Sequence, residues 1–301
     1  MAFTAKDVMN LREKSGAGML ECKKALTDAD GDMEKAAELL RERGIAKAVK
    51  KEGRIAAEGA VGAYVCEKCG TGVLLEINCE SDFVSRGDKF HEIVDSVAKV
   101  VAENKPADVE ALNECKLGDG TVKDFITNQT AIIGEKISIR RFEIFVTEGK
   151  LETYIHMGGK VGVMVEATNF KAGEEETLHD IALQIAAAKP SYVTEGEVPA
   201  AVLDKEKEIM LVQMQNDPKN ANKPKEILEK IVAGKMGKFY QDNCLLDQPF
   251  VKDDGKKVKE VIGSKFTVAR FVRFEMGEGL EKKSENLQDE VAKQVAAMKK
   301  N

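Results

Sequence analysis

The sequence predicts an α+β protein, and three patterns along its 301 residues support this class. Residues 4–44 carry apolar side chains at the spacing of short amphipathic helices. A pattern of two strands followed by a helix then occurs twice, and a further helical stretch interrupts the second copy. We therefore expect an N-terminal module of three helices, a duplicated core of small antiparallel sheets packed with helices, an inserted antiparallel helical hairpin and a C-terminal helix.

The N-terminal module is predicted from its helix caps and breaks. Thr4 can cap a first helix, and Ser15-Gly16-Ala17-Gly18 separates that helix from a second. Asp30-Gly31-Asp32 turns the chain into a third helix, which we expect to end at Gly44. Residues 46–54 are basic but contain no aromatic side chain, so we interpret them as a solvated linker. The module with its linker covers residues 1–55.

The core is predicted to be duplicated because strand residues recur at a constant interval. Gly59 returns as Gly149 and Glu76 returns as Glu166, each 90 positions later (149 − 59 = 90; 166 − 76 = 90). A later strand pattern also recurs, over residues 134–149 and 263–279, and both copies end in Glu-Gly. The predicted subdomains are residues 56–148 and residues 149–279.

The second subdomain contains an insertion at about residues 200–243. Residues 202–215 and 227–236 both have helical spacing, and a polar segment with two prolines separates them. Two helices joined by a short turn form an antiparallel hairpin. The sequence leaves open whether this hairpin contacts a partner or forms a homodimer. Residues 280–301 are predicted to form a C-terminal helical module.

Composition argues against several kinds of partner. The formal charge is −6 and tryptophan is absent, so neither charge nor a base-stacking surface indicates nucleic acid. No apolar run approaches the roughly 20 residues that span a bilayer, and residues 1–7 carry no secretory or transit signal. We therefore expect a cytoplasmic protein with reduced cysteines and with neither a nucleic-acid nor a membrane partner.

The absence of catalytic motifs predicts a protein without catalytic residues, metal or cofactor. The sequence contains no G-x-x-x-x-G-K-[ST] loop, no H-E-x-x-H and no G-x-S-x-G. Cys66 and Cys69 could supply half of a zinc site or a redox dithiol, but no second pair completes four ligands. Gly70 and Gly72 indicate that the two cysteines lie in a β-turn, and the three histidines form no visible cluster.

The segment Cys79-Glu80-Ser81-Asp82-Phe83-Val84 follows a duplicated strand, but its acid–aromatic pair occurs only once. Ser81 can cap the helix that follows, and Asp82 suits the positive end of that helix. Phe83 either packs in the core or projects as an anchor for a partner, and spacing alone favours the core. His156, at a strand end before a glycine turn, fits a contact surface and a satisfied turn equally well.

Ordered motifs extend along nearly the whole chain. They include Ser15-Gly16-Ala17-Gly18-Met19, Asn78-Cys79, Ser81-Asp82-Phe83-Val84, Ile133-Gly134-Glu135, Ala188-Lys189-Pro190, Gln248-Pro249-Phe250-Val251 and Arg273-Phe274-Glu275-Met276-Gly277-Glu278-Gly279. Together they resemble the bacterial elongation factor Ts family. The resemblance implies a ubiquitin-associated-like N-terminal module and a guanine-nucleotide exchange factor for the GTPase elongation factor Tu, active in translation elongation.

The resemblance also implies which residues contact that GTPase. In the family, an acid–aromatic pair enters the GTPase near the nucleotide and disturbs its Mg²⁺ site. By position this role falls to Asp82 and Phe83, within the segment Ser81 to Val84. Ser81 replaces the more usual threonine and keeps a capping hydroxyl, so we expect little change. The other implied contacts are Met19, Leu20, Lys23, Ile133, His156 and Val251.

Two other functions are kept as alternatives. An adaptor built on the helical module and the hairpin would bind a partner without changing the rate of GDP release. A thiol or zinc protein built on Cys66 and Cys69 would retain a tightly bound zinc ion.

Overall fold

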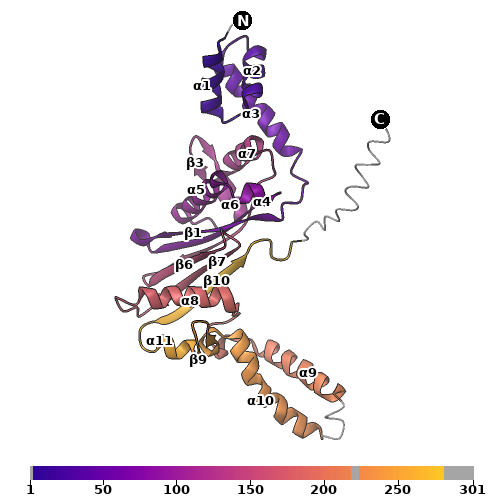
Figure 1. Ribbon diagram of the computed structural model, residues 1–301, viewed down its shortest axis with the longest axis vertical. Helices are drawn as coiled ribbons and strands as arrows, with labels where there is room; N and C mark the ends of the chain where they lie inside the picture. The colour runs from indigo at the N-terminus through magenta and orange to yellow at the C-terminus, as the bar shows by residue number, and fades with distance from the viewer. Residues whose placement is uncertain (1–2, 218–223, 281–301) are drawn as a thin grey trace. The chain divides into compact units, whose positions relative to one another are not determined.

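The structure is a computed structural model that describes residues 3–217 and 224–280. They form two compact units (Figure 1). The first unit comprises Met1–Val61, Leu75–Phe142 and Glu275–Asn301, and the second comprises Gly62–Leu74 and Glu143–Phe274. Both units mix helices with small sheets, which confirms the predicted α+β class. The helix predicted in the C-terminal module lies outside the described residues.

The predicted three-helix module is present at the N-terminus. Its helices are α1 (Ala5–Ser15), α2 (Met19–Asp28) and α3 (Met33–Val49). As expected, Thr4 caps α1, in a capping box that Asp7 completes from inside the helix. The helices share a small apolar core formed by Val8, Leu11, Cys22, Ala25, Leu26, Ala29 and Ala36.

The prediction that the third helix ends at Gly44 is wrong, because α3 continues through this glycine to Val49. A glycine inside a helix costs about 1 kcal/mol relative to alanine. Here the missing side chain permits a close approach, since a Cβ at position 44 would lie 3.1 Å from the Cβ of Ala131. Ala131 belongs to α7 (Val122–Ile133), so Gly44 is a packing position between α3 and α7.

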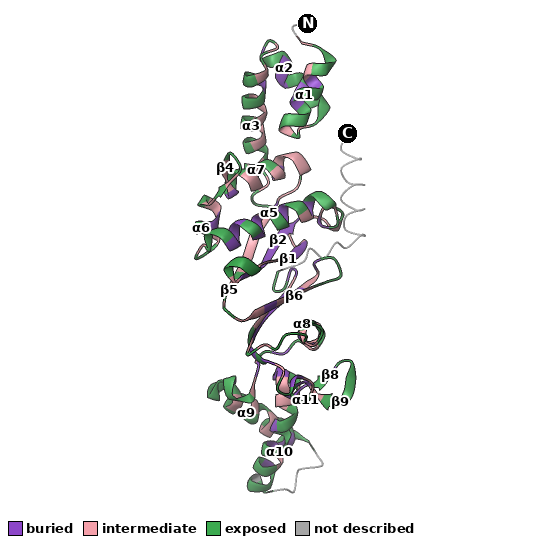
Figure 2. Cartoon of the chain, turned by 90° about the vertical axis from the view of Figure 1, so that its left-hand side faces the viewer, coloured by how far each residue is buried: buried purple, intermediate pink, exposed green. Residues whose placement is uncertain are grey.

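The first copy of the duplicated core contains a three-stranded sheet in the order β1-β2-β5. Its strands are β1 (Glu58–Cys66), β2 (Thr71–Cys79) and β5 (Ser138–Val146). All nine residues of β2 are buried. The helix α5 (Asp88–Asn104) has one buried face and one exposed face (Figure 2). The remaining elements are α4 (Asp82–Ser85), α6 (Val109–Glu114) and the short antiparallel strands β3 (Lys116–Leu117) and β4 (Gly120–Thr121).

The second copy repeats this arrangement in a sheet with the order β10-β7-β6. Its strands are β6 (Lys150–His156), β7 (Val161–Thr168) and β10 (Thr267–Glu275). In each sheet the second strand of the copy, β2 or β7, is central, and the third strand, β5 or β10, lies at an edge. This shared strand order supports the duplication seen in the sequence.

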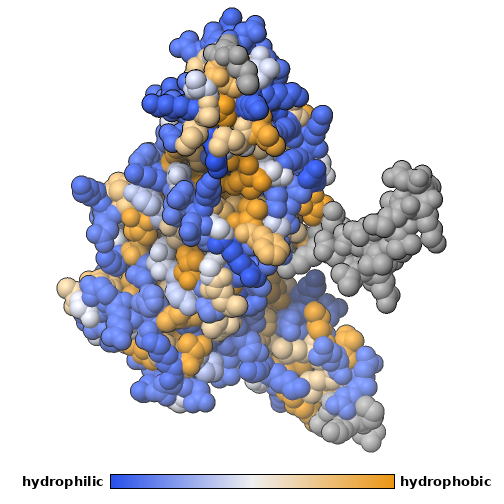
Figure 3. Space-filling model, turned by 45° about the horizontal axis from the view of Figure 1, so that its top comes forward, coloured by the Kyte–Doolittle hydropathy of each residue, from blue (hydrophilic) through white to orange (hydrophobic). Residues whose placement is uncertain are grey.

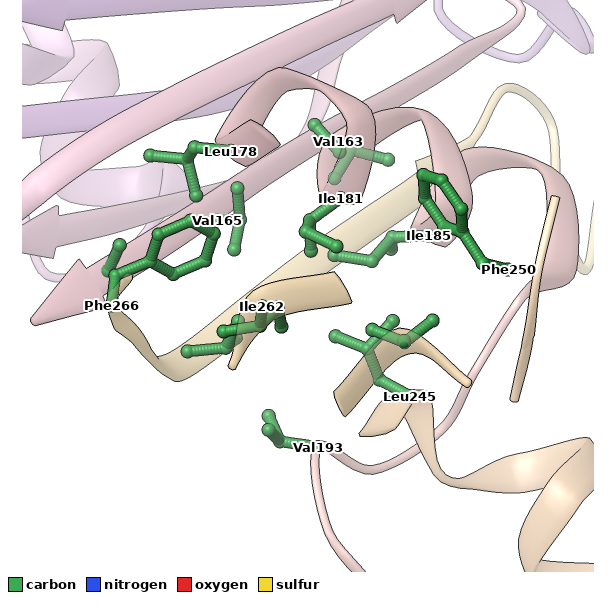
Figure 4. Packing of buried hydrophobic residues seen from close by; sticks show 14 residues of the cluster. Val163, Val165, Leu178, Ile181, Ile185, Val193, Leu245, Phe250, Ile262 and Phe266 are labelled. Carbon is green, nitrogen blue, oxygen red and sulfur yellow. The ribbon is translucent and has the colours of Figure 1, made fainter. Parts of the chain in front are cut away.

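A continuous apolar core joins the second sheet to its helices (Figure 4). Val163 and Val165 of β7 point toward Leu178, Ile181 and Ile185 of α8 (Glu175–Ala188). The same core includes residues near α11 (Val258–Ile262) and the short strands β8 (Pro249–Phe250) and β9 (Asp253–Lys257). A close-packed core of this kind makes the sheet a rigid support for the loops at its ends.

The predicted helical hairpin is formed by α9 (Ala200–Asn216) and α10 (Lys225–Asn243), which lie side by side. Met214, Leu228 and Val232 are buried between them. Ile209, Val212 and Ile227 are instead exposed, and hydrophobic side chains are visible on the surface of the hairpin (Figure 3).

The central strand of the first sheet buries a carboxylate. Glu76 has no exposed surface, and it accepts hydrogen bonds from Arg140 Nη1 at 2.9 Å, Arg141 Nε at 2.7 Å and the Gly277 N–H at 2.8 Å. Burial alone would raise the pKa of Glu76. The Gly277 N–H and the two guanidinium groups outweigh it and hold this pKa below its ordinary value.

The second sheet also pairs a buried glutamate with an arginine, at equivalent positions. Glu166 accepts hydrogen bonds from Arg270 Nε at 2.6 Å and Thr147 Oγ1 at 2.5 Å. Arg270 follows Arg141 by 129 positions (270 − 141 = 129), the interval that also separates Gly134 from Gly263 (263 − 134 = 129). The duplication therefore includes a buried glutamate on the central strand that pairs with an arginine on the third strand of each copy.

Replacing Glu76 by Gln keeps the shape of the side chain and removes its charge. At pH 7 we expect the free energy of unfolding to fall by about 3 kcal/mol, because one partner of a buried ion pair loses its counter-charge. The pKa of Glu76 is lower in the folded state than its ordinary value of 4.5. The stabilisation is therefore complete above about pH 4.5 and is lost as the pH falls through the folded-state pKa.

Urea unfolding of both proteins at pH 7 and at a series of lower pH values measures this dependence. The gap between wild type and Glu76→Gln should narrow as the pH falls below about 4.5. Glu143→Gln, at an exposed position of β5, is the matched control and should behave like wild type. A gap of constant size at every pH would contradict the assignment.

Candidate functional site

Phe83 lies on a short helix directly after β2, and it is 88% exposed. No other large apolar side chain in residues 3–217 and 224–280 is more exposed. The core position that spacing favours for Phe83 is therefore wrong. The physical reason is that α4 has only four residues and buries Ser85, whereas Phe90 at the start of α5 fills the core and is 1% exposed.

A carboxylate from a distant part of the chain holds the corner before Phe83. Glu135 accepts hydrogen bonds from the Ser81 N–H at 2.9 Å and from the Ser81 hydroxyl at 2.6 Å. Ser81 Oγ in turn accepts the Val84 N–H at 3.4 Å, which confirms the predicted helix cap. The residues next to this pair make the reverse contact: here the carboxylate comes from Glu80, whose Oε1 accepts the Lys136 N–H at 2.7 Å.

Asp82 stays at the surface beside Phe83. Its carboxylate lies 2.8 Å from Arg86 Nη2, one helical turn further on, and both side chains are substantially exposed. Exposed pairs of this kind contribute little to stability, usually below about 1 kcal/mol. The Asp82 carboxylate can therefore exchange Arg86 for another partner at small cost.

The predicted contact residues of the N-terminal module are exposed. Met19 and Leu20, at the start of α2, are 43% and 82% exposed, and Lys23 one turn later is exposed too. A Cβ at Gly16, just before α2, would lie 2.9 Å from Ile132 Cδ1, so this end of the module packs against the end of α7. Ile133 is the half-buried last residue of α7.

His156 lies in the second unit, at the exposed end of β6. Its Nδ1 is 2.8 Å from the Tyr154 hydroxyl, and the Tyr154 ring centroid is 5.7 Å from the ring centroids of both His156 and His179. His179 Nδ1 in turn lies 2.8 Å from Glu152 Oε1. His156 and His179 therefore both lie beside the Tyr154 ring. The alternation of Glu152, Tyr154 and His156 along one face of a strand could have indicated part of this arrangement.

Val251, also in the second unit, is 51% exposed, and a buried amide fixes its backbone. Its N–H donates to Gln184 Oε1 at 2.7 Å. Gln184 has no exposed surface and also donates to Gln248 Oε1 and to the Pro249 carbonyl, each at 3.1 Å. Sequence reasoning missed Gln184, whose only signal is a polar residue on the apolar face of a helix.

Cys66 is the last residue of β1, and Cys69 is the last residue of the single turn of 3₁₀ helix (Glu67–Cys69) that follows, rather than both lying in the predicted β-turn. The Cys69 Sγ lies 3.7 Å from the Cys66 carbonyl oxygen. In the described part of the chain, no group of three or more His, Cys, Asp or Glu side chains is placed to hold a metal ion.

Among the described helices, none is both long enough and apolar enough to cross a membrane.

The chain is similar to known proteins over nearly its whole length. Residues 80–278 match the family model described as Elongation factor TS. A protein named Elongation factor Ts from Clostridium perfringens (strain SM101 / Type A) is 47% identical over 302 aligned residues, which cover 97% of this chain and 98% of the relative. Relatives of the same name from Alkalilimnicola ehrlichii and Clostridium novyi (strain NT) are each 46% identical. They cover 98% and 97% of this chain, and 99% and 98% of their own lengths.

The exposure of Phe83 predicts that its side chain contributes little to stability. We expect Phe83→Ala to change the free energy of unfolding by no more than about 0.5 kcal/mol, because the side chain is already in water. Phe90→Ala, seven residues further on, is the matched comparison and should cost about 3–5 kcal/mol, since it empties a core position. Urea unfolding measures both changes, and a large loss in the Phe83 variant would show that this ring is packed.

Proposed function

The chain belongs to the elongation factor Ts family, and we propose that it is a guanine-nucleotide exchange factor for the GTPase elongation factor Tu. In this proposal it binds the GDP-bound GTPase, promotes release of GDP and so supports translation elongation in the cytoplasm. Asp82 and Phe83 enter the GTPase near its Mg²⁺ and phosphate site.

The observation that carries the proposal is the exposure of Phe83 on a fixed corner. Single exposed apolar side chains are common on protein surfaces, so the fixed corner that carries Phe83, and not its exposure alone, points to a partner. Aromatic residues of this kind are typical anchors of interfaces, where they fill a pocket in the partner. The hydrogen bonds of Ser81 hold the corner already in the free protein. Little ordering cost then remains when the partner binds.

Exchange of this kind requires no catalytic side chain on the factor. The factor must bind the nucleotide-free GTPase more tightly than the GDP-bound one, and this difference in affinity lowers the affinity for GDP. The coupling is reciprocal, so GDP with Mg²⁺ also displaces the factor. Each tenfold weakening of GDP affinity requires about 1.4 kcal/mol of coupling, which a few buried anchors can supply.

The remaining predicted contacts are assigned to the grip on the GTPase rather than to the nucleotide site. Met19, Leu20 and Lys23 present exposed side chains from one helix, as a helical docking module requires. His156 and Val251 are both exposed and are held by Tyr154 and Gln184 respectively. In this proposal these residues supply affinity, whereas Asp82 and Phe83 supply the coupling to GDP. Ile133 joins the same grip.

Phe83→Ala should reduce the acceleration of GDP release by at least tenfold, because the ring that disturbs the nucleotide site is missing. Stopped-flow release of fluorescent GDP from elongation factor Tu measures the rate at increasing concentrations of the full chain. Met9→Ala, which truncates another exposed apolar side chain, is the matched control and should accelerate release like wild type.

The same measurement distinguishes an adaptor from an exchange factor. An adaptor would bind elongation factor Tu without changing the rate of GDP release. Wild-type rates with the Phe83 variant would refute the role of the ring, and no acceleration by the wild-type chain would refute exchange activity.

A further inference from the structure

We propose that Glu135 is a positioning residue for Phe83. Its carboxylate holds the corner at the end of β2 in the orientation from which the ring projects. The effect on exchange rests on the proposed function of Phe83, whereas the effect on the conformation of the corner does not.

The geometry at Ser81 links Glu135 to the helix that carries Phe83. A serine hydroxyl has one hydrogen to donate and two lone pairs that accept. The hydrogen goes to Glu135 Oε1 at 2.6 Å, so the lone pairs remain free for the Val84 N–H at 3.4 Å. Glu135 Oε2 holds the backbone N–H of the same serine at 2.9 Å. One carboxylate thus fixes both the backbone and the hydroxyl of the residue that caps α4.

The neighbouring pair of residues reinforces this contact. Glu80 Oε1 accepts the Lys136 N–H at 2.7 Å, and Glu80 Oε2 lies 3.2 Å from Arg54 Nη1. The segment after β2 and the segment before β5 are therefore joined by two carboxylates. Glu80 accepts a backbone N–H of the second segment, and Glu135 accepts a backbone N–H of the first. Charge-assisted hydrogen bonds of this type are stronger than neutral ones. We call these four residues, Glu80, Ser81, Glu135 and Lys136, the carboxylate clamp.

The second copy of the duplication closes the equivalent corner without a carboxylate clamp. Lys171 stands where Ser81 does (171 − 81 = 90), and its N–H donates to the Lys265 carbonyl at 3.1 Å. Ser264 stands where Glu135 does (264 − 135 = 129). The scaffold therefore does not need the carboxylate to form this corner.

The second copy lacks both the exposed aromatic ring and the carboxylate clamp. Ala172 and Gly173 stand where Asp82 and Phe83 do in the first copy. Phe170 replaces Glu80, and its ring packs against Phe266 with a centroid distance of 5.8 Å. The carboxylate clamp thus occurs only in the copy that presents an exposed aromatic ring. We therefore assign the clamp to positioning that ring rather than to forming the sheet.

Substitution of Glu135 tests the proposal in the stopped-flow assay of GDP release. We expect Glu135→Ala to reduce the acceleration at least tenfold, and Glu135→Gln to reduce it less, because an amide oxygen can still accept the Ser81 N–H. Asp124→Ala removes the capping carboxylate of α7 and leaves the Ser81 contacts in place. This matched control should lower stability without a comparable loss of exchange.

A double-mutant cycle separates positioning from general destabilisation. If Glu135 acts through Phe83, Glu135→Ala should cause little further loss in the Phe83→Ala background. Equal losses in both backgrounds, or a loss in Asp124→Ala as large as in Glu135→Ala, would overturn the proposal. If Phe83→Ala loses exchange while Glu135→Ala keeps it, positioning fails and the proposed function stands.

A second measurement needs no partner protein. Because the chain contains no tryptophan, Phe83→Trp places a single indole at the exposed position, and time-resolved anisotropy reports how freely this indole moves. Adding Glu135→Ala should increase the amplitude of the fast motion at least twofold, whereas adding Asp124→Ala should not. Unchanged anisotropy with Glu135→Ala would overturn the positioning role even if exchange activity is present.

Discussion

A buried glutamate paired with arginine determines the register of each three-stranded sheet. In the first sheet Arg140 reaches Glu76 from a strand 64 residues later in the chain. A slip of one residue between these strands would turn their side chains to the opposite face. It would also break the hydrogen bonds that Arg140 and Arg141 both donate to the buried Glu76 carboxylate, and a buried carboxylate that loses its partners costs several kcal/mol. The ion pair therefore excludes the neighbouring registers more strongly than apolar packing alone does.

The carboxylate clamp is a consequence of this register. Glu80 lies four residues after Glu76, and Lys136 lies four residues before Arg140. Contacts between the two segments run in opposite directions, so advancing four residues on one side and retreating four on the other leads from the first contact to the second. The next step brings Ser81 to Glu135. The buried pair thus positions the corner from which Phe83 projects.

Much of the fold was predictable because it follows from local spacing and from repetition. The interval from Glu76 to Glu166 revealed the two copies, and the caps and breaks indicated the N-terminal helices and the hairpin. Gly44 was misjudged because its role is close contact with Ala131, 87 positions away (131 − 44 = 87). The exposure of Phe83 and the contact of Glu135 also depend on tertiary packing, which spacing does not encode. An alignment of the two copies, which places Glu135 against Ser264, would have shown that only the first copy has a carboxylate at this position.

The duplication explains how a stable scaffold can carry an exposed aromatic ring. Both copies keep the buried glutamate with its arginine and the order of the strands, so the stability of each sheet does not depend on the corner. One copy can then close its corner with Phe170 packed against the apolar core, while the other exposes Phe83 and replaces the lost packing with charge-assisted hydrogen bonds. A corner whose backbone is already held in place loses little conformational entropy on binding. More of the interface energy then remains to weaken the binding of the nucleotide, which is the quantity that an exchange factor must supply.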